Sequence, residues 1–145
     1  MEWPMAVRTW VEGRARGPLL RLDEPLSMWG GFDPADGGIV DVHHPQYGES
    51  MTGRMVFLPA CRGSAGTPAA LAESLRSGVG ASGFILGHAE VNLVTGVWVA
   101  NRLYASEIPV VQLRAEQLDG IESGRWLRIE AGELHLETEP LSSGP

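Results

Sequence analysis

Lysine is missing from this sequence, cysteine occurs once, and no stretch approaches the ~20 apolar residues that a membrane span needs. All 11 basic residues are arginines, which excludes a lysine Schiff base. The single cysteine, Cys61, excludes an internal disulfide, a zinc site built on paired cysteines and a four-cysteine cluster within these 145 residues. Any such cluster must therefore be held by another chain.

Positive charge is also scarce, because 18 acidic residues outnumber the 11 arginines and the formal net charge is −7. Nucleic acids and anionic membranes are bound through an excess of Lys and Arg, and the sequence has no basic cluster. Residues 1–5 lack the basic start and apolar run of a secretion signal. We therefore expect a cytoplasmic protein that binds neither nucleic acid nor membrane, with one domain over 1–139 and a disordered tail over 140–145.

The apolar pattern predicts a mixed α/β chain without internal repeats. Strands are expected at 6–11, 18–22, 53–58, 82–86 and 108–113, with a final hairpin of 126–130 and 133–137 that turns at Ala131 and Gly132. One helix is expected at 69–77, with Thr67 as N-cap, Pro68 in the first position and Gly78 after the end. Further helices are expected at 94–104 and 115–121, although Gly96 weakens the first and 97–99 could be a strand.

The loop between the strand at 53–58 and the helix at 69–77 contains an arginine, a glycine and a serine in sequence, Arg62, Gly63 and Ser64. Loops of this kind at the carboxyl edge of a sheet bind ligands in open α/β folds, and a helix N-terminus favours an anion. Arg62 could pair with a carboxylate or phosphate, and Gly63 allows close backbone approach. On the loop alone, a turn serine that bonds nearby backbone is the favoured interpretation of Ser64, whereas pairing with a substrate is favoured over a surface ion pair for Arg62. Cys61 fits a small buried hydrophobe.

Two segments that precede this loop in the sequence form, together with R-G-S, a specific set of motifs. The sequence reads E-P-L-S-M-W-G-G-F-D at 24–33 and D-V-H-H-P-Q-Y-G at 41–48, followed by R-G-S at 62–64. In this order the three motifs resemble the small subunit, or swivel domain, of the aconitase X family, over about 13–112. The chain departs from the family after R-G-S, where further serines are usual and Ala65, Gly66 and Thr67 stand instead.

The resemblance implies a swivelling β/β/α domain, a barrel-like mixed sheet with flanking helices. It implies a subunit of a heterodimeric hydro-lyase, in which a large subunit binds the iron-sulfur cluster and this chain contributes Ser64 as the base and no metal ligand. Substrate contacts are expected from Arg62, Gly63, Ala65, Ser27, Trp29 and Gly30. The family dehydrates cis-3-hydroxy-L-proline in bacteria or mevalonate 5-phosphate in archaea, and the composition, rich in Arg, Ala and Gly, favours the first.

Two readings from other classes remain open. In a self-contained serine hydrolase, a histidine such as His44 and an acid such as Asp41 would activate Ser64, although the G-x-S-x-G elbow is absent because position 62 is arginine. Alternatively, the chain is a binding module that kept the fold and lost its partner.

The glycine-rich stretch 23–53 is too long for an idle connection and predicts a binding surface. Its first part, 23–48, carries Trp29 and Phe32, which a loop buries with difficulty, so we expect much of the subunit interface there. His43 and His44 do not suit one metal ion, because Pro45 favours extended backbone, in which neighbouring side chains point to opposite sides. A loop-bracing or interface role is expected for them.

Overall fold

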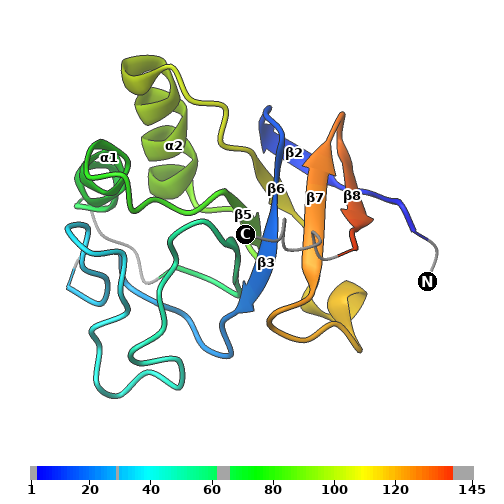
Figure 1. The fold of residues 1–145 in the computed structure, drawn as a ribbon, viewed down its shortest axis with the longest axis horizontal. Helices are drawn as coiled ribbons and strands as arrows, with labels where there is room; N and C mark the ends of the chain where they lie inside the picture. Colours follow the sequence, from blue (N-terminus) through cyan, green and yellow to red (C-terminus); the bar gives the residue numbers. More distant parts are fainter. Residues whose placement is uncertain (1–2, 29, 62–65, 139–145) are drawn as a thin grey trace, which may run out of the picture.

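The computed structural model describes residues 3–28, 30–61 and 66–138, which form one eight-stranded sheet with two helices against it (Figure 1). The strands are β1 (Met5–Ala6), β2 (Arg8–Val11), β3 (Ala15–Arg21), β4 (Met55–Leu58), β5 (Gly83–Leu86), β6 (Val110–Gln112), β7 (Trp126–Glu130) and β8 (Glu133–Leu136). The helices are α1 (Thr67–Arg76) and α2 (Val91–Tyr104), with a 3-10 turn, η1 (Ala115–Leu118). No helix in this described part is long and apolar enough to cross a membrane.

The sheet closes on itself into a barrel-like form. Its strand order is β1-β8-β7-β3-β4-β5-β6-β2, so β1 and β2 are the two edges, yet only Val7 separates them in the chain. β1 pairs antiparallel with β8, and β2 pairs antiparallel with β6. The strand expected at 6–11 is therefore one extended segment that changes partners at Val7, whose amide donates to Gly132 O at 3.1 Å. The expected barrel-like mixed sheet is confirmed.

The four strands β3 to β6 run parallel to one another, and β4 and β5 are buried at every position. In β4, Met55 and Phe57 pack in the cluster that also includes residues of β7 and β8, while Val56 and Leu58 pack in the cluster that includes the helices. All four β4 side chains are 2% exposed or less. Burial on both faces explains why this strand reads as a continuous apolar run instead of alternating.

The two helices lie together on one outer side of the sheet (Figure 1). Gly96 is buried inside α2, and a Cβ there would lie 2.9 Å from Pro68 Cα of α1, so the glycine allows the helices to approach closely. The helix expected at 94–104 is confirmed and begins earlier, while the strand alternative at 97–99 is wrong. Thr67 is not the N-cap of α1: Gly66 is the cap, and Thr67 is the first helical residue.

The stretch 23–53 is irregular, held by the isolated bridges Phe32–Ile39 and Gly38–Ser50. It is nevertheless packed, because several of its apolar side chains belong to the core beneath the helices: Leu26, Met28, Phe32, Ile39 and Met51. The expectation that Phe32 would be hard to bury is wrong, since it is 4% exposed. Among the described residues of this stretch, the large hydrophobic side chains that are exposed are those of Val40, Val42 and Tyr47.

The last hairpin turns as expected at Ala131 and Gly132, both with positive φ (53° and 76°), as a two-residue turn of the primed type requires. The helix expected at 115–121 is shorter than the pattern predicts, because only the 3-10 turn η1 forms.

Candidate functional site

The carboxyl ends of β4 and β5 form the edge at which the predicted site lies. The two strands are parallel neighbours, with Leu58 opposite Leu86, so the loops that follow them leave the sheet side by side. Gly87 donates its amide to Leu58 O at 2.8 Å. A Cβ on Gly87 would lie 2.7 Å from Pro59 O, closer than real Cβ contacts come. The loop from β5 therefore braces the first residues of the loop from β4.

The first sequence motif also reaches this edge. Leu26 forms a parallel bridge with Cys61, and its amide donates to Ala60 O at 3.4 Å. The half-buried Ser27 follows, and its carbonyl accepts a 3.2 Å hydrogen bond from Gly31 N. Gly30, inside this turn, has a φ of +95°, a conformation that favours glycine. Ser27 and Gly30 are thus placed in a turn beside the strand end that leads to Arg62.

Five of the predicted site residues lie outside the described part of the chain: Arg62, Gly63, Ser64, Ala65 and Trp29. Their roles stay predictions, as does the tail expected at 140–145. The structure describes the residues on either side of the loop, Cys61 and Gly66, and so fixes where the loop leaves and rejoins the fold.

His44 ties the second motif to the first. Its ring is 6% exposed, Nδ1 accepts the Gln46 amide at 3.0 Å, and Nε2 lies 3.0 Å from Glu24 O. Because Nδ1 is the acceptor, the proton is on Nε2 and is donated to the Glu24 carbonyl. The Gln46 side chain adds bonds to Asp23, accepting from its amide at 3.0 Å and donating to Oδ2 at 2.7 Å. His44 therefore has the loop-bracing role that was expected.

Replacing His44 with alanine should destabilise the chain by about 1–3 kcal/mol, because the Glu24 carbonyl and the Gln46 amide lose buried partners. Urea unfolding gives this free energy. His43 is the matched control: it is exposed, and only its backbone amide is bonded, to Asp41 Oδ1 at 2.9 Å. His43→Ala should change stability by less than about 0.5 kcal/mol. Equal losses for the two variants would contradict the bracing role.

The surroundings of Cys61 favour the protonated thiol over the thiolate. It is half-buried and packs against the core beneath the helices. Burial, and secondarily the charge of Glu90, raise the pKa of Cys61 from 9.0 to about 12. Thiolates are the nucleophiles and metal ligands of cysteine chemistry, so this thiol is suited to neither task near neutral pH. The expectation of a small buried hydrophobe agrees with this setting.

Alkylation of Cys61 at pH 8 should be slow in the folded chain and fast after unfolding. The raised pKa also predicts a pH effect on stability, because the unfolded thiol gives up its proton near pH 9 and the folded thiol only near pH 12. The stability difference between wild type and Cys61→Ala should be constant below pH 9 and shift against wild type as pH rises from 9 towards 12. A difference independent of pH would contradict the assignment.

Two residues of this edge, His88 and Glu90, carry no motif signal and were missed by the sequence analysis. Both follow β5, so they lie on the loop beside the one that contains Ser64. His88 is exposed, and Glu90 caps α2 by accepting the Asn92 amide at 3.2 Å. One general rule could have indicated them: neighbouring parallel strands end at the same edge of a sheet, and ligands bind there. Any polar residue directly after the strand expected at 82–86 was therefore a candidate.

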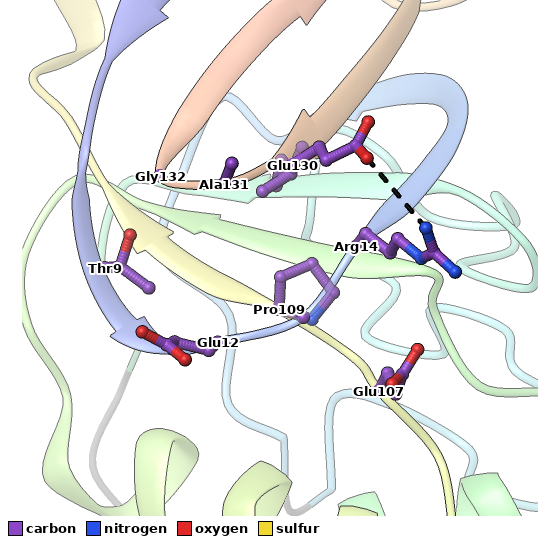
Figure 2. Close-up of a pocket in the computed structure, with 10 residues that line it drawn as sticks. Thr9, Glu12, Arg14, Glu107, Pro109, Glu130, Ala131 and Gly132 are labelled. Carbon is purple, nitrogen blue, oxygen red and sulfur yellow. Dashed lines mark ion pairs between the residues drawn. The ribbon is translucent and has the colours of Figure 1, made fainter.

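A hollow with a volume of about 590 Å³ lies at the other end of the barrel. It is formed by the β2–β3 and β7–β8 turns and by the residues before β6, as Figure 2 shows. Glu12, Glu107 and Glu130 line it with Arg14, which lies 3.9 Å from Glu130. Because Glu107 and Pro109 precede β6, this hollow is at the amino ends of the parallel strands and is separate from the predicted site.

Within residues 3–28, 30–61 and 66–138, no three or more His, Cys, Asp or Glu side chains are grouped so as to hold a metal ion. The described part of the site offers backbone amides, a helix N-terminus and hydroxyl groups, together with the Glu90 carboxylate near Cys61. The amides and the helix N-terminus suit the binding of an anion.

Comparisons with known proteins agree with the motifs. The sequence is 35% identical over 123 residues to a protein of Hypocrea jecorina named cis-3-hydroxy-L-proline dehydratase, a match covering 85% of this chain and 21% of that protein. It is 31% identical over 122 residues to the phosphomevalonate dehydratase small subunit of Methanothermobacter thermautotrophicus, covering 83% and 88%. The chain thus spans about a fifth of the first relative and most of the second.

The fold is shared with the crystal structure of Thermococcus kodakaraensis aconitase X in its holo-form. The TM-score is 0.81 at 24% identity, and the match covers 92% of this chain and 97% of that one. The sequence profile described as the aconitase X swivel domain matches residues 4–138, nearly the whole chain. The chain therefore belongs to the aconitase X swivel domain family.

Proposed function

We propose that this chain is the small subunit of an aconitase X-type dehydratase, in which Ser64 removes the proton from carbon. One observation supports the proposal: the first two motifs are joined to each other and to Cys61, the residue that directly precedes the third motif. Leu26 of the first motif pairs with Cys61, directly before the R-G-S motif. His44 of the second motif bonds to Glu24 of the first. Two segments that are distant in the sequence, 24–33 and 41–48, are thereby connected beside the strand end that precedes the R-G-S motif.

The chemistry proposed for Ser64 needs support, because a hydroxyl is a poor base in water. An alkoxide must be stabilised by positive charge and by donors that need no reorganisation. Arg62 supplies charge two residues away in sequence, and the N-terminus of α1 supplies orphan amides and the positive end of a helix dipole. No acidic residue lies in the first turn of α1 to oppose them.

The residues of this chain do not fit an iron-sulfur cluster. Such clusters are held by several thiolates, whereas Cys61 is the single cysteine and its pKa is raised to about 12. The cluster that the family implies is therefore assigned in this proposal to the large subunit. This chain's own part is to hold the base and to orient the substrate.

We infer that the substrate is cis-3-hydroxy-L-proline, with mevalonate 5-phosphate as the second candidate. A relative that is 35% identical has the first compound in its name, which supports the choice made from composition. The name of the archaeal relative, which is 31% identical, supports the second, and that protein is close to this chain in length.

The contact surface proposed for the large subunit is narrower than the stretch 23–48. Val40, Val42 and Tyr47 are 43%, 66% and 57% exposed, and all three lie in or beside the second motif. Exposed apolar side chains grouped near a site are typical of association surfaces.

The experiment mixes this chain with a cluster-bearing large subunit and assays each compound separately. Turnover of cis-3-hydroxy-L-proline is expected, and turnover of mevalonate 5-phosphate alone would overturn the substrate assignment. In the same sample, hydrogen exchange of residues 40–47 should slow on mixing. Unchanged exchange would contradict the contact surface while leaving the activity assay to judge the function.

The structure argues against His44 and Asp41 as the base and acid of the serine hydrolase alternative. Both ring nitrogens of His44 are engaged within the loop, and Asp41 Oδ1 accepts from His43 N and not from an imidazole. A triad needs a histidine whose free nitrogen faces the serine and whose other nitrogen donates to the acid. His44 and Asp41 do not have that arrangement.

A further inference from the structure

Thr67, the first residue of α1, carries a buried hydroxyl whose hydrogen bonding is unaccounted for. The residue is 1% exposed, and Oγ1 has no hydrogen-bond partner in the described part of the chain. The comparison within the same helix is Ser74, also buried at 2%, whose hydroxyl donates to Leu71 O at 2.8 Å. Buried polar groups in folded proteins are nearly always paired, so the Thr67 hydroxyl calls for a partner from outside this set.

The hydroxyl lies at an uncapped helix end. The N-cap, Gly66, has no side chain to bond the first turn, and the first amide with a helical acceptor is that of Ala70, which donates to Gly66 O at 3.0 Å. Pro68 has no amide proton, so Thr67 and Ala69 carry the first-turn amides that lack intrahelical acceptors. In a helix each Cα–Cβ bond tilts towards the N-terminus, so the Thr67 side chain leaves α1 towards this end, on the buried face that it shares with Ala70, Leu71 and Ser74.

We propose that Thr67 Oγ1, with the first-turn amides of α1, binds an oxyanion of the substrate, a carboxylate or a phosphate. The groups at this helix end are donors, the dipole places positive charge there, and the first turn contains no carboxylate that would compete. A threonine in place of the family's usual serine-rich continuation thus keeps a hydroxyl at this end of the loop. The identification of the anion as the substrate's rests on the proposed function.

Because the Thr67 hydroxyl has no partner in the described part of the chain, removing it should affect stability and binding differently in a binding role and in a structural role. If Oγ1 awaits a ligand, Thr67→Val should raise the melting temperature of the free chain, because a methyl group replaces an unsatisfied polar atom of similar shape. It should at the same time weaken oxyanion binding by about tenfold or more, since a hydrogen bond to a charged group is lost. Thr67→Ser keeps the hydroxyl and should bind as wild type does.

The test uses NMR of the full chain, following the amide signals of Thr67 and Ala69 during separate titrations with inorganic phosphate and with acetate. Saturable shifts with phosphate alone assign a phosphate, shifts with acetate assign a carboxylate, and either result supports the site. The absence of localised shifts with both anions overturns it. Binding by the chain is measured without turnover, so a failure of the proposed dehydratase function would be seen separately in the assembled enzyme.

Ser74→Ala is the matched control, because it removes a buried hydroxyl of the same helix that already has an acceptor. It should lower the melting temperature and leave the anion titrations unchanged. If Thr67→Val behaves as Ser74→Ala does, with lower stability and unaltered binding, the Thr67 hydroxyl is structural and the proposal is overturned.

Discussion

Replacing Ser64 with alanine should lower the turnover of the assembled enzyme by ~10²-fold or more, the range expected when a positioned proton-transfer group is lost. The fold, the association with the large subunit and the cluster should stay intact, because the change removes only one hydroxyl from a loop. Substrate affinity should change little, since the base acts mainly in the transition state. Steady-state kinetics of the reconstituted complex measure both quantities.

Arg62→Ala provides the contrast. An arginine that pairs with a substrate carboxylate or phosphate acts in the ground state and in the transition state alike, so this variant should raise KM as well as lower kcat. If Ser64→Ala retains near-normal turnover, the base lies elsewhere. This chain would then serve to exclude water and position the substrate.

Gly87→Ala should be a damaging substitution at the site edge, with a loss of about 1–3 kcal/mol in the free energy of unfolding. The new Cβ would lie 2.7 Å from Pro59 O and 3.1 Å from Pro59 Cα, and both are backbone atoms that cannot rotate away. Relief requires the loops after β4 and β5 to separate. Because Pro59 lies five positions before Ser64 in the sequence, turnover of the assembled enzyme should fall as well.

The stability part is measured by urea unfolding, with Ala89→Ser as control, because Ala89 is exposed in the same loop. The control should change stability by less than about 0.5 kcal/mol. A Gly87→Ala chain as stable as this control would show that the two loops are not tightly braced. If Gly87→Ala lowers stability but leaves turnover unchanged, the contact between the two loops stabilises the fold without positioning Ser64.

The central strands and the helices were predictable because their signals are local. The apolar run of 55–58 and 83–86 predicts strands buried on both faces, and Pro68 followed by a run of helix-forming residues predicts α1. Closure of the sheet was not predictable from pattern. It depends on the segment from Met5 to Val11 pairing with β8 on one side and β6 on the other, which only long-range contacts decide.

The site shows the same division. The three motifs mark it in the sequence, and the bond of His44 to Glu24 explains why the second motif accompanies the first. His88 and Glu90 lie at the site edge because β5 is the parallel neighbour of β4. Their residue types alone do not indicate this position. Phe32 was misjudged because a long loop without periodicity can still contribute to a core when its turns fold back over a sheet.

The most direct test of the account compares dehydratase turnover by this chain alone with turnover after mixing with a cluster-bearing large subunit. We expect no turnover from the purified chain free of iron, because its one cysteine cannot hold a cluster, and substantial turnover from the mixture. Turnover by the chain alone would contradict the division of labour proposed here. An inactive mixture with a correctly assembled complex would contradict the dehydratase assignment itself.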